Sequence, residues 1–95
     1  MIIEIKLNKE QQKTFEHFDI DKFNEICELK YTDAGLLITY DDTISNTAFQ
    51  ALLDEQIVVY GLDDDFNETD LAWEMYRMQD KILFQIGTQR GTLRN

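Results

Sequence analysis

The chain has 95 residues, of which 43% are hydrophobic and 12% aromatic, and its formal net charge at pH 7 is -10. This length fits one small domain, and the aromatic content distinguishes the chain from natively disordered acidic chains. The negative charge disfavours direct contact with nucleic acid or membranes and favours a basic protein as partner. No apolar run approaches the roughly 20 residues that cross a bilayer, and the N-terminus lacks a signal-peptide pattern, so we expect a cytoplasmic protein.

The first segment of the chain alternates between apolar and charged residues. Ile2–Leu7 therefore predicts a half-buried strand. Asn8 can cap a following helix, and Gln11 stands at the position that completes a capping box. Lys9–Phe18 favours a helix but is only weakly amphipathic, so this helix is expected either to break near residues 19–21 or to run on beyond them.

Two further alternating segments predict a β-hairpin. Glu25–Thr32 places Cys27 on the same face as two other apolar side chains, and Leu36–Asp41 alternates in the same way. Gly35 stands between the two segments, where a glycine can adopt the positive φ of a tight turn. The single cysteine excludes an intramolecular disulfide, and it is expected to act as a small core residue in a reducing compartment.

The middle of the chain predicts a helix followed by a short buried strand. Ser45 is a natural N-cap, and the apolar spacing after it predicts a helix that ends near Glu55. Ile57–Tyr60 is rich in β-branched residues and is bounded by Gly61. Such a run is typical of a buried strand.

The longest predicted element is a C-terminal helix. Asn67 is expected to cap it, and one apolar stripe runs along about five turns. The stripe consists of Leu71, Met75, Met78, Ile82 and Ile86. Gly87 is expected to end the helix, which leaves residues 88–95 as a flexible basic tail. Trp73 and Phe84 fall outside the stripe, so they are expected to be either exposed or covered by another helix.

The predicted order of elements is β-α-β-β-α-β-α, in a single α+β domain over residues 1–87. The first six elements have the order of a ferredoxin-like sandwich with an antiparallel sheet, and the long C-terminal helix is added to it. Other α+β sheets share this order, and a fold does not by itself determine a function.

The sequence contains no set of residues that assembles into a catalytic site. His17 is the single histidine and lies on the weak helix, whereas Cys27 lies in a strand pattern among acidic residues. The four glycines are isolated, so there is no phosphate-binding loop, and no zinc-ligand spacing occurs. We therefore expect a protein that is not an enzyme and that carries no cofactor.

Residues 63–74 have part of the spacing of a calcium-binding loop. The ligands at positions one, three, five and twelve would be Asp63, Asp65, Asn67 and Glu74. Glu68, however, occupies the position where glycine makes the sharp turn, and a strand rather than a helix is predicted before the loop. A weak divalent-cation site is thus one alternative, and an acidic loop leading into a capped helix is the simpler interpretation.

The acidic residues are concentrated in one part of the chain. Residues 31–80 carry twelve of the nineteen acidic residues and a single basic one, whereas residues 81–95 carry no acidic residue. The leading hypothesis is that this region binds a basic, nucleic-acid-binding protein and blocks it. The candidate contact residues are Asp41, Asp42, Asp63, Asp64, Asp65, Glu68, Asp70, Trp73 and Arg77, with Asp54 and Glu55 as further acidic residues. Whether the acidic loops meet in space depends on the directions of the strands.

In size, acidity and lack of a catalytic set, the chain resembles inhibitors from phages and mobile elements that mimic nucleic acid. Anti-CRISPR and anti-restriction proteins are examples, and bacterial immunity proteins share this character. The resemblance is one of overall character, and no diagnostic motif carries it. A different class of function is a structural or assembly module that forms a homodimer through the C-terminal helix.

Overall fold

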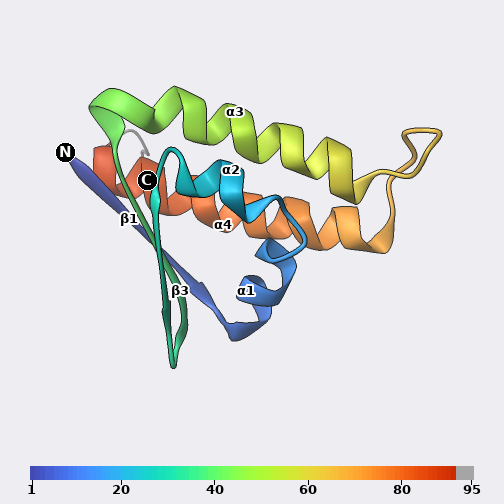
Figure 1. The fold of residues 1–95 in the computed structure, drawn as a ribbon, viewed down its shortest axis with the longest axis horizontal. Coiled ribbons are helices and arrows are strands. Elements are labelled where there is room, and N and C mark those ends of the chain that lie inside the picture. Colours follow the sequence, from blue (N-terminus) through green and yellow to red (C-terminus); the bar gives the residue numbers. More distant parts are fainter. Residues whose placement is uncertain (92–95) are drawn as a thin grey trace.

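The computed structural model describes residues 1–91 and shows a three-stranded sheet packed against helices (Figure 1). The elements in chain order are β1 (Ile2–Asn8), α1 (Lys9–Phe15), α2 (Ile20–Asn24), β2 (Glu28–Thr32), β3 (Gly35–Asp41), α3 (Asp42–Gly61) and α4 (Asp70–Arg90). The α+β class and the long C-terminal helix are thus confirmed. The predicted basic tail includes residues 92–95, which lie outside the described residues.

The sheet has the strand order β1-β3-β2, and both strand pairs are antiparallel. Its register places Ile5 of β1 opposite Ile38 of β3, and Ile38 opposite Leu29 of β2. The predicted hairpin between β2 and β3 is confirmed, and Gly35 begins β3 with a φ of 145°. Because side chains alternate along a strand, the buried apolar residues of β1 and β3 share the face of the sheet that the helices cover.

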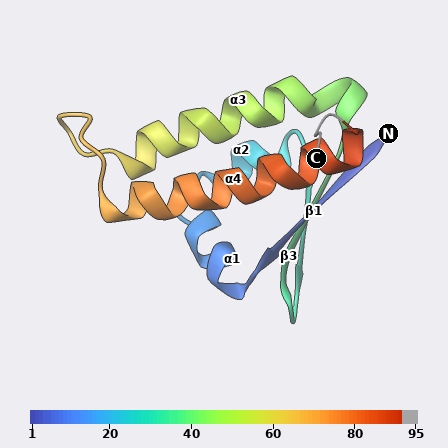
Figure 2. The same cartoon turned by 180° about the vertical axis from the view of Figure 1, so that it is seen from behind.

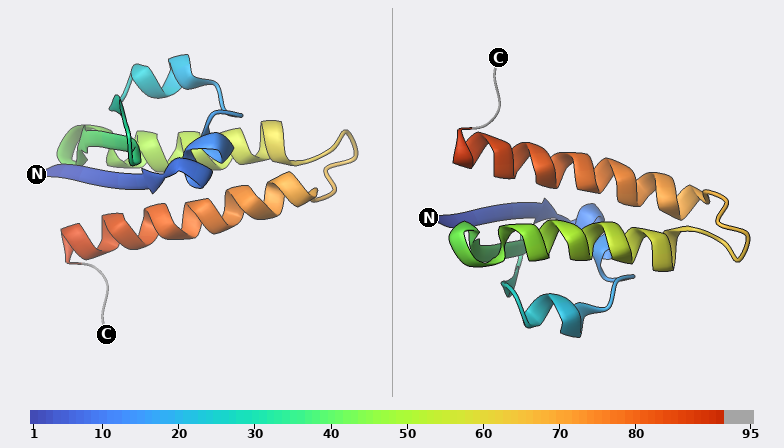
Figure 3. Two further views of the ribbon diagram at one scale, coloured as in Figure 1. Left: turned by 90° about the horizontal axis from the view of Figure 1, so that it is seen from below. Right: turned by 90° about the horizontal axis from the view of Figure 1, so that it is seen from above.

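α3 and α4 form a long antiparallel helical hairpin beside the sheet (Figure 2). α4 packs against β1, α3 against β3, and the short α2 against β2, while α1 lies against α4 (Figure 3). The loop that joins α3 to α4 projects from one end of the molecule, away from the sheet (Figure 1). Within residues 1–91, no helix has both the length and the apolar character needed to cross a bilayer.

The core lies between the inner face of the sheet and the helices, and its centre is aromatic. The ring centroids of Phe15 and Phe23 are 4.8 Å apart, and the ring of Tyr40 stacks on that of Phe49 at the same distance. α4 contributes the predicted apolar stripe, which is buried except at its first, half-buried residue. The buried members are Met75, Met78, Ile82 and Ile86.

Glutamine side chains, rather than another strand, cover the free edge of β1. Each glutamine Oε1 accepts a hydrogen bond from a backbone N–H of β1, at N···O distances of 2.7, 2.8 and 2.9 Å. The two glutamines of α4 also donate back to the carbonyl oxygens of the same β1 residues. The three pairs are Glu4 with Gln89, Lys6 with Gln85, and Asn8 with Gln11. Backbone groups that another strand would otherwise pair with are therefore occupied.

The predicted elements of the first third are confirmed, with two corrections to their bounds. The capping box is present, because the Asn8 side chain accepts a hydrogen bond from the Gln11 backbone and the Gln11 side chain accepts one from the Asn8 backbone. α1 ends at Phe15 rather than Phe18, and a second helix begins at Ile20, so the weak helix breaks, which is one of the two expected alternatives. β2 begins at Glu28 rather than Glu25, which places Cys27 before the strand.

The predicted strand at Ile57–Tyr60 is wrong, because these residues form the last turns of α3. Phe49, Leu53 and Ile57 recur every four residues and are all buried, so one helical face continues through the β-branched run. Gly61 is the next residue on this face, and a Cβ there would lie 3.1 Å from the backbone of α4. Packing against α4 thus outweighs the local strand propensity. Without the fourth strand, the ferredoxin-like sandwich is not confirmed.

The predicted starts of the two long helices are also wrong. α3 begins directly after β3, and its N-cap is Asp41 rather than Ser45. α4 begins two residues later than predicted, and its N-cap is Thr69 rather than Asn67. Both segments contain more than one side-chain oxygen that can cap a helix, and the sequence does not show which of them is used.

The predicted end of α4 is wrong as well. The helix continues past Gly87, which is buried, and ends at Arg90. Gly91 follows in the left-handed conformation that is common after a helix, with a φ of 71°. The first three residues of the predicted tail therefore belong to α4.

Candidate functional site

The predicted acidic loops lie at opposite ends of the helical hairpin. Asp41 and Asp42 stand where α3 begins, whereas residues 63–65 follow its last residue. A helix of 20 residues is about 30 Å long, so α3 holds the two groups of carboxylates far apart (Figure 1). The acidic loops therefore do not form a single patch.

The carboxylates at the start of α3 are engaged within the chain. Hydrogen bonds from the hydroxyl and the backbone N–H of Thr43 lower the pKa of Asp41. Asp42 accepts a hydrogen bond from the Met1 amino group at 2.9 Å and lies 3.2 Å from the guanidinium group of Arg90. These two carboxylates thus support the start of the helix and the end of α4, and they are poorly placed for a partner.

Asp63 orders the loop between α3 and α4, residues 62–69, which we call the tip loop. Its Oδ1 accepts hydrogen bonds from the backbone N–H groups of Asp65 and Asn67, both at 2.9 Å. Its carbonyl oxygen accepts a further bond from the backbone N–H of Phe66, also at 2.9 Å. The tip loop is therefore held in one shape although most of its side chains are exposed.

Phe66 is the most exposed aromatic residue of the tip loop and of the described chain. It is 73% exposed, and its φ of 62° lies in the left-handed region that residues other than glycine rarely occupy. An exposed ring in such a conformation costs free energy without contributing to the core, and strained positions of this kind cluster at functional sites. Phe66 is not among the predicted contact residues. Its position directly after three aspartates could have indicated an exposed aromatic contact residue.

Free negative charge surrounds Phe66 in the tip loop. Asp64, Asp65 and Glu68 are exposed. Within residues 1–91, their carboxylates take part in no ion pair and no hydrogen bond. Asp70 adds a carboxylate in the first turn of α4, where the positive end of the helix dipole favours it. The tip loop thus presents an aromatic side chain among carboxylates that are available to a partner.

The two remaining acidic candidates lie along α3 rather than on the tip loop. Asp54 accepts a hydrogen bond from the side-chain amide of Gln79 on α4. Glu55 lies 3.8 Å from the ammonium group of Lys22 on α2. Both carboxylates therefore have neighbours within the chain.

Trp73 and Phe84 are exposed, with exposed fractions of 52% and 63%, so the expectation of exposure is the correct one. Together with Arg77 and Asp80 they recur at spacings of four, three and four along α4. These four residues form one face, which we call the outer stripe, and it lies opposite the buried stripe of the same helix. Trp73 and Arg77 therefore belong to a helix face rather than to the tip loop.

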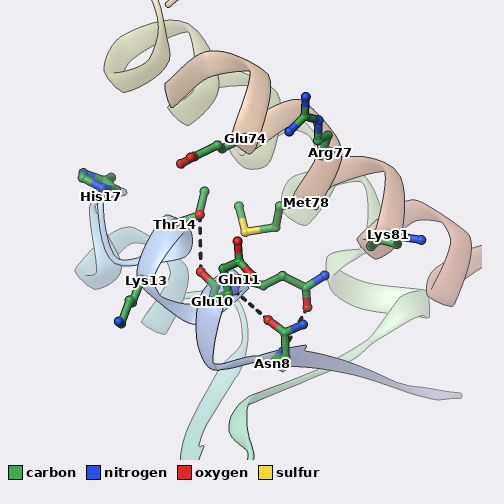
Figure 4. Close-up of a pocket in the computed structure, with 10 residues that line it drawn as sticks. All are labelled: Asn8, Glu10, Gln11, Lys13, Thr14, His17, Glu74, Arg77, Met78 and Lys81. Carbon is green, nitrogen blue, oxygen red and sulfur yellow. Dashed lines mark hydrogen bonds between the residues drawn. The ribbon is translucent and has the colours of Figure 1, made fainter. Parts of the chain in front are cut away.

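A cavity of about 440 Å³ lies between α1 and α4 (Figure 4). Its lining places basic groups against acidic ones, and the capping box of α1 forms one of its walls. The charged residues are Glu10, Lys13, Glu74, Arg77 and Lys81. His17 also lines this cavity whereas Cys27 does not, so the two side chains considered for catalysis are not combined in one site.

Cys27 is half-buried, and its Sγ donates a hydrogen bond to the carbonyl oxygen of Phe23 at 3.0 Å. Burial raises the pKa of this thiol to about 12. A thiol is nucleophilic only as the thiolate, so the environment of Cys27 suppresses its reactivity.

Alkylation of Cys27 by iodoacetamide at pH 8 is expected to be at least ~100-fold slower in the native protein than in urea-unfolded protein. An ordinary pKa of 9.0 leaves about a tenth of the thiol ionised at this pH, whereas a pKa of about 12 leaves about one part in ten thousand. Mass spectrometry of timed samples measures both rates. Equal rates in the two states would show that the thiol is not protected.

The structure does not assemble the predicted calcium ligands. Within residues 1–91, no group of three or more His, Cys, Asp and Glu side chains is arranged to hold a metal ion. The Oδ1 of Asp63, which would be the first ligand, instead accepts two backbone hydrogen bonds. The spacing of acidic residues in this segment is accounted for by the loop and by the start of α4.

Comparison of the chain with models of protein families, with curated proteins and with solved structures found no match. The tip loop and the outer stripe are therefore interpreted from their own geometry and chemistry.

Proposed function

We propose that this is a non-enzymatic binding protein, which docks its tip loop on a basic surface of a nucleic-acid-binding protein and thereby blocks that surface. The proposal rests mainly on Phe66, whose side chain is exposed among free carboxylates and whose backbone has a positive φ. The contact residues would be Phe66 with Asp64, Asp65 and Glu68, and Asp70 would add to the local charge. In this mode of action the protein resembles inhibitors from phages and mobile elements that mimic nucleic acid.

The tip loop combines two contributions that a complex of this kind needs. The carboxylates increase the rate of association with a basic surface and disfavour acidic partners. Burial of Phe66 in an apolar recess of the partner would contribute about 1.5–3 kcal/mol and slow dissociation. Because Asp63 already orders the loop, little conformational entropy is lost on binding.

The proposal leaves out five of the predicted acidic contacts. Asp63 is one of them, because its side chain orders the tip loop. Asp41 and Asp42 lie at the far end of α3 and are engaged with their neighbours. Asp54 and Glu55 interact with α4 and α2. Trp73 and Arg77 lie on the outer stripe, which is a separate face of the molecule.

Affinity capture with matched variants tests the proposal. The immobilised protein is compared with the variant Asp64→Asn/Asp65→Asn/Glu68→Gln in extracts of host cells, with and without infecting phage. A control variant removes the same number of charges elsewhere, at exposed residues that have no side-chain partner among residues 1–91. These residues are Glu25, Glu28 and Asp33, changed to Gln, Gln and Asn.

We expect one captured protein to be retained by the control variant and lost by the tip-loop variant. Purified, it should bind a fluorescent DNA or RNA duplex and release it when this protein is added. The affinity of the complex should fall by about tenfold or more between ~0.05 and ~0.3 M salt, and by about tenfold with Phe66→Ala. Capture that is equal for both charge variants, or a captured protein that keeps its nucleic acid, would contradict the proposal.

Asp63→Ala is expected to loosen the tip loop without unfolding the domain. The substitution removes the acceptor of two backbone hydrogen bonds, so the amides of Asp65 and Asn67 should exchange with solvent about tenfold faster. Hydrogen exchange measured by NMR gives these rates. Asp64→Ala is the matched control, since the Asp64 carboxylate has no partner among residues 1–91, and it should leave both amides unchanged.

A further inference from the structure

The outer stripe of α4 is an unpartnered face within the described part of the chain. Its two aromatic side chains are more than half exposed. Arg77 and Asp80 lie between them in the sequence, are exposed, and form no ion pair within residues 1–91. At 100° per residue, all four side chains project within about 60° of one another, on the side opposite the buried stripe.

The order of residues along the outer stripe is self-complementary. If a second α4 lies antiparallel to the first, with a two-fold axis that passes between Met78 and Gln79, Arg77 of each copy faces Asp80 of the other. The same axis places Trp73 of each copy opposite Phe84 of the other. One arrangement therefore satisfies both charges and covers both aromatic rings, and each contact occurs twice.

We propose that the protein forms a homodimer in which the outer stripes of two α4 helices pack against each other antiparallel. The spacing of four, three and four is that of the a and d positions of a heptad, which form the seam of a coiled coil. In this register an a residue of one helix packs with a d residue of the other, so Arg77 meets Asp80 and Phe84 meets Trp73.

The residues that flank the outer stripe suit the same arrangement. Glu74 and Lys81 lie on one side of it and are spaced by seven residues, so an antiparallel copy brings unlike charges together. Tyr76 and Leu83 lie on the other side with the same spacing, and both are partly accessible apolar side chains. A parallel copy in register would instead place Arg77 opposite Arg77 and Asp80 opposite Asp80, so like charges would meet at the seam.

The dimer uses a face other than the tip loop, so it goes beyond the proposed function. The tip loop projects from one end of the helical hairpin (Figure 2). Antiparallel packing of α4 would therefore place the two tip loops at opposite ends of the assembly, where both remain accessible. A helix of 21 residues is about 30 Å long, and a contact between two such helices is smaller than a standard interface. We therefore expect a dissociation constant in the micromolar range rather than a permanent dimer.

A charge swap tests both the dimer and its register. Sedimentation equilibrium from ~5 µM to ~1 mM is measured for the protein, for Arg77→Asp, for Asp80→Arg and for the double swap Arg77→Asp/Asp80→Arg. Lys22→Asp changes the net charge as Arg77→Asp does, but on α2, and serves as the control. Circular dichroism establishes that each variant is folded, and the single tryptophan, Trp73, reports burial by its fluorescence.

We expect each single substitution to raise the dissociation constant by at least about tenfold, because it places two like charges together twice. The double swap restores both ion pairs and should return the dissociation constant to within about threefold of the original, as should the control. A protein that stays monomeric at 1 mM, single variants that dimerise normally, or a double swap that fails to restore the dimer would each overturn the proposal. None of these outcomes depends on the tip loop.

Discussion

Replacing Gly35 with alanine is expected to lower the free energy of unfolding by about 3 kcal/mol or more. The new Cβ would lie 1.9 Å from the carbonyl oxygen of Leu7 on β1, much closer than non-bonded atoms approach. The φ of 145° at Gly35 is in addition unfavourable for alanine. The β1–β3 pair would have to separate at this end, where Asn8 pairs with Gly35.

Urea denaturation followed by circular dichroism measures this loss. Gly91→Ala is the matched control, because Gly91 also has a positive φ, of 71°, but no atom of residues 1–91 outside its immediate neighbours in the chain lies within 4 Å of a Cβ there. It should lose only about 1 kcal/mol, the cost of the backbone conformation alone. Equal losses at the two glycines would show that β1 does not approach Gly35 as closely as described.

Phe49→Ala is expected to destabilise the domain by about 3–5 kcal/mol, the usual range for an aromatic side chain removed from a core. Phe49 is fully buried, and its ring contacts the rings of Tyr40 and Phe23 at centroid distances of 4.8 and 5.8 Å. It therefore connects α3 to β3 and to α2. A loss of this size is a large part of the total stability of a small domain.

Phe84→Ala makes the same chemical change on an exposed face of α4, where Phe84 is 63% exposed. At low protein concentration its unfolding free energy should stay within about 0.5 kcal/mol of the original, since little burial is lost and alanine favours a helix. If both substitutions had the same cost, the aromatic cluster would not be the centre of the core.

Much of the fold could be predicted because it depends on short-range patterns. The alternation of Ile2–Leu7, the capping box at Asn8 and the turn glycine at Gly35 each need only a few neighbouring residues. The apolar stripe of α4 was equally readable, because a period of 3.6 residues maintained over five turns has no competing interpretation.

The wrong predictions concern segments whose structure depends on distant residues. Ile57–Tyr60 has strand propensity, but its conformation is determined by how Ile57 and Gly61 pack against α4. The wrong strand prediction also affected the candidate site. With a strand at this position, the sequence did not determine whether the acidic loops lie close together or far apart. Once this segment is helical, α3 alone separates Asp42 from Asp63.

The conformation of Phe66 could not be predicted from sequence. Its positive φ results from the hydrogen bonds that converge on Asp63, and nothing in the local pattern marks a left-handed residue at that position. For a similar reason, the sequence did not decide whether Trp73 and Phe84 are exposed or covered by another helix. Only the packing of the whole domain shows that both rings stay more than half exposed.

The glutamine pairs along β1 also constrain how α4 can be altered. Four residues of helix advance about 6.0 Å and two residues of strand about 6.6 Å, so Gln85 and Gln89 keep step with Lys6 and Glu4. The mismatch of roughly 0.6 Å grows with each further glutamine pair, so only a few successive pairs of this kind can form between a helix and a strand. The next β1 residue on this edge, Asn8, is paired with the side-chain amide of Gln11 on α1 instead. Insertion of a single residue into α4 before Gln85 would rotate both of its glutamine amides away from β1 and leave Glu4 and Lys6 unpaired at this edge.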